Sequence, residues 1–117
     1  MDVTVSREDY RVVQTHAEID LSNVATLRAA LDEAVKDCPQ GFVIDLSGSR
    51  YIDSSGIAAI VAAYRRVHSQ GGGLALVAPD HYLRRILAII NLHTLPSFFI
   101  CDTVDEAHKA LAVPDKA

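Results

Sequence analysis

Cysteine is scarce in this chain, and its two cysteines stand far apart. Cys38 and Cys101 are the only ones among the 117 residues, and no Cys-x-x-Cys spacing occurs. The usual motifs of a redox pair and of a thiolate metal site are therefore excluded. Because a free cysteine behaves as a small hydrophobic residue, we expect both thiols to be buried.

The sequence also lacks the motifs that bring catalytic or metal-binding side chains together. No two histidines have the spacing that places two imidazoles on one helical face, and the hydrolase elbow, the P-loop and the dinucleotide-binding glycine motif are all missing. The histidines stand at positions 16, 68, 81, 93 and 108. We predict a protein that is not an enzyme and that has neither a metal site nor a cofactor.

Long apolar runs and clusters of basic residues are missing too. No segment approaches the roughly 20 apolar residues that a membrane span requires, and no basic region followed by an apolar stretch opens the chain. The formal net charge is −4, and never more than two basic residues are adjacent. This argues against nucleic acid or an anionic membrane as a partner, and we expect a cytoplasmic protein.

The composition is that of a single folded domain. Half of the residues are hydrophobic and 22% are charged, a balance that supports a compact core. A length of 117 residues suits one such core. Residues 1–58 hold ten acidic and five basic residues, against five and six in the remainder, so the acidity lies in the amino-terminal half.

Hydrophobic periodicity predicts an α/β fold of five strands and four helices. Short β-forming runs indicate strands at 3–5, 11–15, 42–44, 74–77 and 97–101. Apolar residues at steps of three and four indicate helices at 21–38, from 54 to the glycines at 71–73, from 80 to 90, and from 103 onward. The order β-β-α-β-α-β-α-β-α implies a single domain with a mostly parallel mixed β-sheet and helices packed on it. We assign residues 1–113 to this domain and 114–117 to a polar C-terminal tail.

Polar residues that can satisfy free N–H groups stand at the predicted helix starts. Asp20, Ser22 or Asn23 is expected to cap the first helix with its side chain, and Asp80 the third.

One segment, Asp45–Ile57, leaves the central predicted strand and enters the second helix at Ser54-Ser55-Gly56. In the structural interpretation, a serine here is simply the N-cap of that helix. In the functional interpretation, it is a phosphorylation site, because the positive end of a helix with its free N–H donors tolerates a phosphoryl group. The residues alone leave both interpretations open.

The same segment, together with Ala17-Glu18-Ile19-Asp20 and the order of elements, resembles the STAS domain, in particular the small bacterial anti-sigma factor antagonists. The resemblance covers nearly the whole chain, and its most specific parts are Asp-Leu-Ser and Tyr-Ile-Asp-Ser-Ser-Gly-Ile. One departure is Ala17, where the family usually has glycine. Alanine is acceptable there if the backbone has a negative φ.

The resemblance implies a switch protein. In its unphosphorylated form, such a protein binds an anti-sigma factor that is also a serine/threonine kinase, and so frees the sigma factor. The kinase phosphorylates the serine just before the helix glycine, here Ser55, and the modified protein is released until a PP2C-type serine phosphatase resets the cycle. The resemblance implies a monomer or weak dimer whose partner-binding surface contains Asp20, Asp53, Ser54, Ser55 and Gly56.

The acidic residues of the amino-terminal half gather around this motif in the sequence. Glu18, Asp20, Asp45 and Asp53 are expected to surround Ser55. Such a surface would meet a partner patch of positive character, and one more phosphate would disturb the match.

Two other functions remain open. The first is a non-phosphorylated STAS scaffold subunit of a lipid-transport or stress-signalling complex, in which the serine motif packs against a partner. The second is a small-molecule site built from Asp45, Asp53 and Ser55, although no histidine lies nearby in sequence to act as a base. A two-component receiver is not compatible with the sequence, because Lys109 and Lys116 fall in the last helix and the tail.

Overall fold

The computed structural model describes residues 3–7, 10–15, 18–38 and 40–112, with only the backbone of 3–7. Residues 8 and 9 between the first two predicted strands, Ala17 and the predicted tail at 114–117 lie outside this part of the chain. The described residues follow the predicted order and add one short 3-10 helix, η1. The elements are β1 (Val3–Arg7), β2 (Arg11–Thr15), α1 (Val24–Asp37), β3 (Gly41–Asp45), α2 (Ser54–Ser69), β4 (Gly73–Val77), α3 (His81–Ile89), η1 (Leu92–Thr94), β5 (Phe98–Cys101) and α4 (Val104–Ala112).

The five strands form one sheet in the order β1-β2-β3-β4-β5. β1 pairs with β2 in the antiparallel direction, with Val5 opposite Val13. β2, β3, β4 and β5 are parallel to one another, and each crossover between them contains a helix. The predicted mostly parallel mixed sheet is confirmed, with β3 at its centre.

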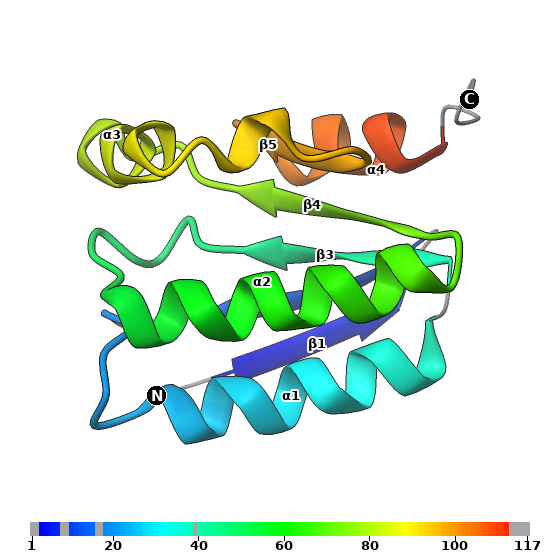
Figure 1. Ribbon diagram of the computed structural model, residues 1–117, viewed down its shortest axis with the longest axis horizontal. Coiled ribbons are helices and arrows are strands. Elements are labelled where there is room, and N and C mark those ends of the chain that lie inside the picture. Colours follow the sequence, from blue (N-terminus) through cyan, green and yellow to red (C-terminus); the bar gives the residue numbers. More distant parts are fainter. Residues whose placement is uncertain (1–2, 8–9, 16–17, 39, 113–117) are drawn as a thin grey trace.

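Helices cover both faces of the sheet. Alternate residues of a strand point to opposite faces, so a single strand contributes to the core on each side. Phe42 and Ile44 of β3 belong to the larger core, which α1 and α2 cover. Val43, between them, belongs to a second core under α4. Figure 1 shows α1 and α2 side by side in front of the sheet. β3 and β4 are buried at every position, as expected for strands covered on both faces.

The starts of the first two helices differ from the sequence-based expectation. No side chain caps α1; instead, Asn23 Oδ1 accepts the Asp20 N–H at 3.0 Å, and the Asp20 carbonyl accepts the Val24 N–H. The N-cap of α2 is Asp53 rather than a serine, because Ser54 already has a helical backbone. In both cases a residue of the preceding loop accepts N–H groups of the helix start. Asp20 does so with its carbonyl before α1, and Asp53 with its carboxylate before α2.

Other local expectations are confirmed. Asp80 caps α3 by accepting the Leu83 N–H at 3.0 Å, and α2 ends before Gly71, whose φ of 86° favours glycine. Cys101 is a buried free thiol as expected, whereas Cys38 is only half-buried. None of the helices in the described part of the chain is long and apolar enough to span a bilayer.

Candidate functional site

The site is built from two loops that leave the carboxyl ends of the neighbouring parallel strands β2 and β3. The Ile19 N–H donates to the Tyr51 carbonyl at 3.1 Å, and the Asp53 N–H donates to the Ile19 carbonyl at 3.0 Å. Ile19 and Ile52 thus form an isolated parallel bridge. In effect, the two loops extend the sheet by one short step, which holds the start of α2 beside the start of α1.

A pair of buried hydroxyls joins the same region from within. Thr15, at the end of β2, and Ser49, in the loop after β3, are both buried, and their side-chain oxygens lie 2.9 Å apart. This hydrogen bond joins the end of β2 to the loop after β3, so it restrains their relative position. The described residues of the two loops are therefore held together as one platform.

The Asp53 carboxylate is the centre of the site. Its Oδ1 accepts the Ser55 hydroxyl at 2.6 Å, the Ser55 N–H at 2.9 Å and the Gly56 N–H at 3.2 Å. Its Oδ2 accepts the Leu21 N–H from the other loop at 3.1 Å. One carboxylate therefore caps α2, orients the serine hydroxyl and ties both loops together.

These hydrogen bonds favour the charged form of the carboxylate. They hold the pKa of Asp53 below its ordinary value of 3.8. The Ser55 hydroxyl is the largest cause; desolvation, the second largest, acts in the opposite direction, and the Gly56, Ser55 and Leu21 N–H groups each lower the pKa further. Asp53 is therefore an anion at neutral pH, held next to the serine oxygen.

Gly56 lets α2 come close to the two loops. A Cβ atom added at this residue would lie 2.5 Å from Ile19 Cγ2 and 2.6 Å from Ile52 Cγ1, which is closer than real Cβ atoms approach. Ile19 and Ile52 are themselves buried. Gly56 is thus a buried packing position that sets the depth of the helix start, and its predicted contact with a partner stays a prediction.

The predicted site residues are brought together, but they differ in exposure. Ser54 is exposed, Ser55 and Asp53 are half-buried, and Asp20 lies in the adjoining loop, half-buried. The Asp20 carboxylate accepts the backbone N–H of Ser22 at 2.9 Å, so it organises its own turn. Serine hydroxyls, a buried glycine and two carboxylates therefore occupy one continuous patch.

The expected ring of acidic residues is only partly present. Glu18 is exposed, and Asp20 and Asp53 face the loop surface, but Asp45 is 5% exposed and lies inside. Its carboxylate accepts hydrogen bonds from Gln14 Nε2 at 3.2 Å and from the Ser47 N–H at 2.9 Å. Asp45 therefore supports the loop after β3 and does not contribute to the surface around Ser55, which also weakens the small-molecule site that needed it.

Two large apolar residues beside the serines escaped the sequence-based prediction. Leu21 is 78% exposed and Tyr51 is 42% exposed, and each takes part through its backbone in the bonds that hold the loops. Leu21 was expected inside the first helix, but it lies in the turn before α1. Its position between two polar residues, away from the apolar stripe of the helix, was the available signal.

The N–H donors at the start of α2 are not free, contrary to the expectation for an anion site. Asp53 already occupies those of Ser55 and Gly56. A phosphoryl group on Ser55 would therefore face a carboxylate as well as the positive end of the helix. Within the described residues, no three histidine, cysteine, aspartate or glutamate side chains are grouped as metal ligands would be.

The fold and the site define a class: a small α/β domain that presents a serine-bearing helix start on a loop platform at the carboxyl edge of a parallel sheet. The STAS domain family model matches residues 2–107, so the chain belongs to the STAS domain family. This confirms the resemblance seen in the sequence.

Three similar proteins illustrate the relationship. The anti-sigma-F factor antagonist RsfB of Mycobacterium tuberculosis is 31% identical over 93 residues, which cover 77% of this chain and 75% of RsfB. The crystal structure of an anti-sigma factor antagonist from Mycobacterium paratuberculosis has a TM-score of 0.80 at 28% identity, covering 96% of this chain and 94% of that one. The Bacillus cell fate determinant SpoIIAA in its phosphorylated form shares the fold, with a TM-score of 0.68 at 19% identity over 92% of this chain and 97% of that one.

Proposed function

We propose that this protein is an anti-sigma factor antagonist controlled by phosphorylation of Ser55. In its unphosphorylated form it binds an anti-sigma factor serine/threonine kinase and so frees the sigma factor. Phosphorylation releases it, and a PP2C-type phosphatase restores the binding form. The protein is thus a ligand and a substrate of enzymes rather than an enzyme. The observation that carries the proposal is the Ser55 hydroxyl, held at 2.6 Å by Asp53 at a half-buried helix start in a chain of this family.

The surface around Ser55 has the composition of a protein interface. Leu21 and Tyr51 supply exposed apolar area, while Ser54 and Asp20 supply polar groups around it. Interfaces commonly combine an apolar or aromatic centre with a polar rim. Because hydrogen bonds between the loops hold these residues, little conformational entropy is lost when a partner binds.

Phosphorylation changes this surface without a need to unfold it. Transfer forms a bond between Ser55 Oγ and the γ-phosphorus of ATP and breaks the bond from that phosphorus to the bridging oxygen, which leaves with ADP. The hydroxyl proton is released to solvent. Ser55 then no longer has a hydroxyl donor for Asp53, and about 1.5 to 2 negative charges are added beside that carboxylate. In a closed interface the Asp53 carboxylate would repel this charge, and the charge would be poorly solvated. Both effects favour release.

Ser55 is preferred to Ser54 as the phosphorylated residue because of its environment. Its hydroxyl has a defined orientation toward Asp53, and the resemblance to the family implies that the modified serine is the one directly before the helix glycine. Ser54 is exposed on the same turn. The chain therefore contains its own matched control, since Ser54→Ala removes an adjacent hydroxyl and leaves the proposed acceptor intact.

The experiment uses the cognate kinase and ATP with the wild-type protein, Ser54→Ala and Ser55→Ala. Intact-mass measurement is expected to show the gain of one phosphoryl group in the wild type and in Ser54→Ala, and none in Ser55→Ala. Binding to the kinase is then measured for the unmodified proteins and for Ser55→Asp. Ser55→Asp is expected to bind at least tenfold more weakly than the wild type, which corresponds to about 1.4 kcal/mol.

Two results would overturn the proposal. A phosphoryl group that remains in Ser55→Ala would place the modification elsewhere. A protein that binds its partner but is never phosphorylated would instead be a scaffold subunit, the alternative left open by the sequence.

A further inference from the structure

The last strand leaves one edge of the sheet open. In the described part of the chain, β5 pairs with β4 alone. The Leu74 N–H donates to the Ser97 carbonyl and the Ala78 N–H to the Cys101 carbonyl, both at 2.9 Å. In a parallel ladder, alternate residues of one strand bond to the same neighbour. Residues 97, 99 and 101 therefore bond toward β4, whereas the N–H and carbonyl of Ile100 point away from the sheet.

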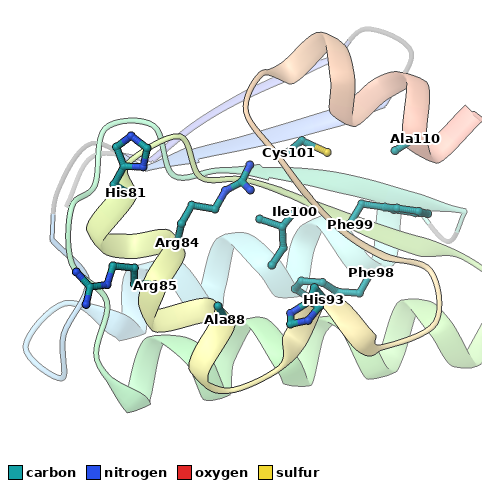
Figure 2. A pocket seen from close by; sticks show the side chains of 10 residues that line it. All are labelled: His81, Arg84, Arg85, Ala88, His93, Phe98, Phe99, Ile100, Cys101 and Ala110. Carbon is teal, nitrogen blue, oxygen red and sulfur yellow. The ribbon is translucent and has the colours of Figure 1, made fainter.

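A groove runs along this open edge. It has a volume of about 640 Å³, and residues of α3, η1, β5 and α4 line it. Figure 2 shows Arg84 and Arg85 on α3 to one side, Ile100 in the middle, and Ala110 of α4 beyond it; the Arg84 guanidinium extends toward Ile100, and that of Arg85 extends outward at the rim. The groove lies on another part of the sheet from the Ser55 site, and none of its lining residues belongs to that site.

The lining comes from both faces of β5. Phe98 and Ile100 pack on the core beneath α1 and α2, whereas Phe99 and Cys101 pack on the core beneath α4. Only an occupant that lies along the edge of the strand contacts both sets at once. An extended peptide has this shape, and its backbone groups match those of Ile100 that point away from the sheet.

The charges differ between the two sides of the groove. Arg84 donates to the Ala78 carbonyl at 2.7 Å and forms an ion pair with Asp102 at 2.6 Å. Arg85 is exposed and has no ion pair with any described residue, so its charge is uncompensated. The opposite side is apolar, with Phe99 and Ala110. Successive side chains of a strand alternate between faces, so acidic and apolar residues in alternation fit the two sides.

We propose that the open edge of β5 is a docking site for an extended segment of a partner protein in which acidic and apolar residues alternate. The segment adds a sixth strand to the sheet through the backbone of Ile100. Its acidic side chains lie on the α3 side, where Arg85 stands at the rim of the groove, and its apolar side chains face Phe99. This proposal is independent of Ser55 and of the anti-sigma function.

The probe is a capped six-residue peptide of alternating glutamate and valine, titrated into the ¹⁵N-labelled protein. The expected result is a saturable shift of the Ile100 amide signal together with slower exchange of that amide with solvent. A peptide in which the valine nitrogens are methylated, which removes the pairing N–H groups, is expected not to bind. Arg85→Glu is expected to weaken binding about fivefold or more. The matched control Arg65→Glu, which changes an exposed arginine on α2, is expected to leave binding unchanged.

Three results would overturn the proposal. The first is the absence of any shift at Ile100 at millimolar peptide. The second is equal binding of a peptide of alternating lysine and valine, which would show that charge does not select the occupant. The third is a concentration-dependent shift of Ile100 without peptide, which would show that a second copy of this chain covers the edge.

Discussion

The Ser55 hydroxyl and the Asp53 carboxylate are joined by a hydrogen bond of 2.6 Å, and the same carboxylate oxygen caps the helix that Ser55 helps to start. The group proposed to be phosphorylated and the group that stabilises the helix are thus in direct contact. Changes at one of them are therefore expected to be measurable at the other.

Replacement of Asp53 is expected to lower both the stability of the fold and the rate of phosphorylation, and a second cap variant serves as the control for stability alone. Asp53→Ala removes the N-cap of α2, the orientation of Ser55 and the bond to the Leu21 N–H. The control is Asp80→Ala, which removes the side-chain cap of α3 and is expected to cost about 1 kcal/mol. In urea unfolding, Asp53→Ala is expected to be the more destabilising of the two. Only Asp53→Ala is expected to slow phosphorylation by the kinase, and equal rates for the two variants would refute a positioning role.

The lowered pKa of Asp53 gives a pH dependence of known sign. A carboxyl group whose pKa is lower in the folded state than in the unfolded state stabilises the fold above its ordinary pKa. That contribution is lost as the pH falls from the ordinary value of 3.8 through the lower folded value. Carboxyl ¹³C NMR is expected to give an Asp53 midpoint below 3.8. In Ser55→Ala the midpoint should rise, and an unchanged midpoint would mean that the hydroxyl is not the main cause.

Gly56→Ala is expected to destabilise the protein although alanine is the better helix former. The added Cβ would overlap with Ile19 and Ile52, and such overpacking costs about 1–3 kcal/mol. Denaturant unfolding checks this, with Ala62→Gly at an exposed position of α2 as the control for helix propensity, which alone is worth about 1 kcal/mol. A Gly56→Ala protein more stable than the wild type would contradict the packing role of this glycine.

Leu21 is expected to contribute to partner binding and not to stability. It is 78% exposed beside the serines, and Ile89, which is 79% exposed on α3, provides a control of equal size and exposure. Both Leu21→Ser and Ile89→Ser are expected to change the free energy of unfolding by about 0.5 kcal/mol or less. Titration calorimetry with the anti-sigma kinase should show weaker binding for Leu21→Ser alone. Equal effects of the two changes would place the interface elsewhere.

The fold was accessible from the sequence because its signals are local. The continuous apolar runs that became β3 and β4 and the three-to-four spacing of α1 and α2 each depend on neighbouring residues. The helix caps were harder to predict, because Asp20, Ser22 and Asn23 all have suitable side chains. The choice among them depends on bonds within the loop, such as that from the Asp20 N–H to Asn23.

The site was accessible only in part, for a physical reason. The serine motif at 54–56 lies in one continuous segment, so the sequence could point to it. The roles of Leu21 and Asp45 depend on contacts between segments. The Leu21 N–H donates to the Asp53 carboxylate, 32 residues further along the chain. The Asp45 carboxylate accepts a hydrogen bond from Gln14 on the neighbouring strand. No local pattern contains such contacts.

The strands occupy the sheet in the same order in which they occur along the chain. Each new strand is added beside the one made before it, and none has to be inserted between two existing strands. During synthesis, which proceeds at about 5–20 residues per second, the amino-terminal hairpin can therefore serve as the template for the next strand and helix. The five strands of the sheet can therefore pair one after another, from β1 to β5, in the order in which they leave the ribosome.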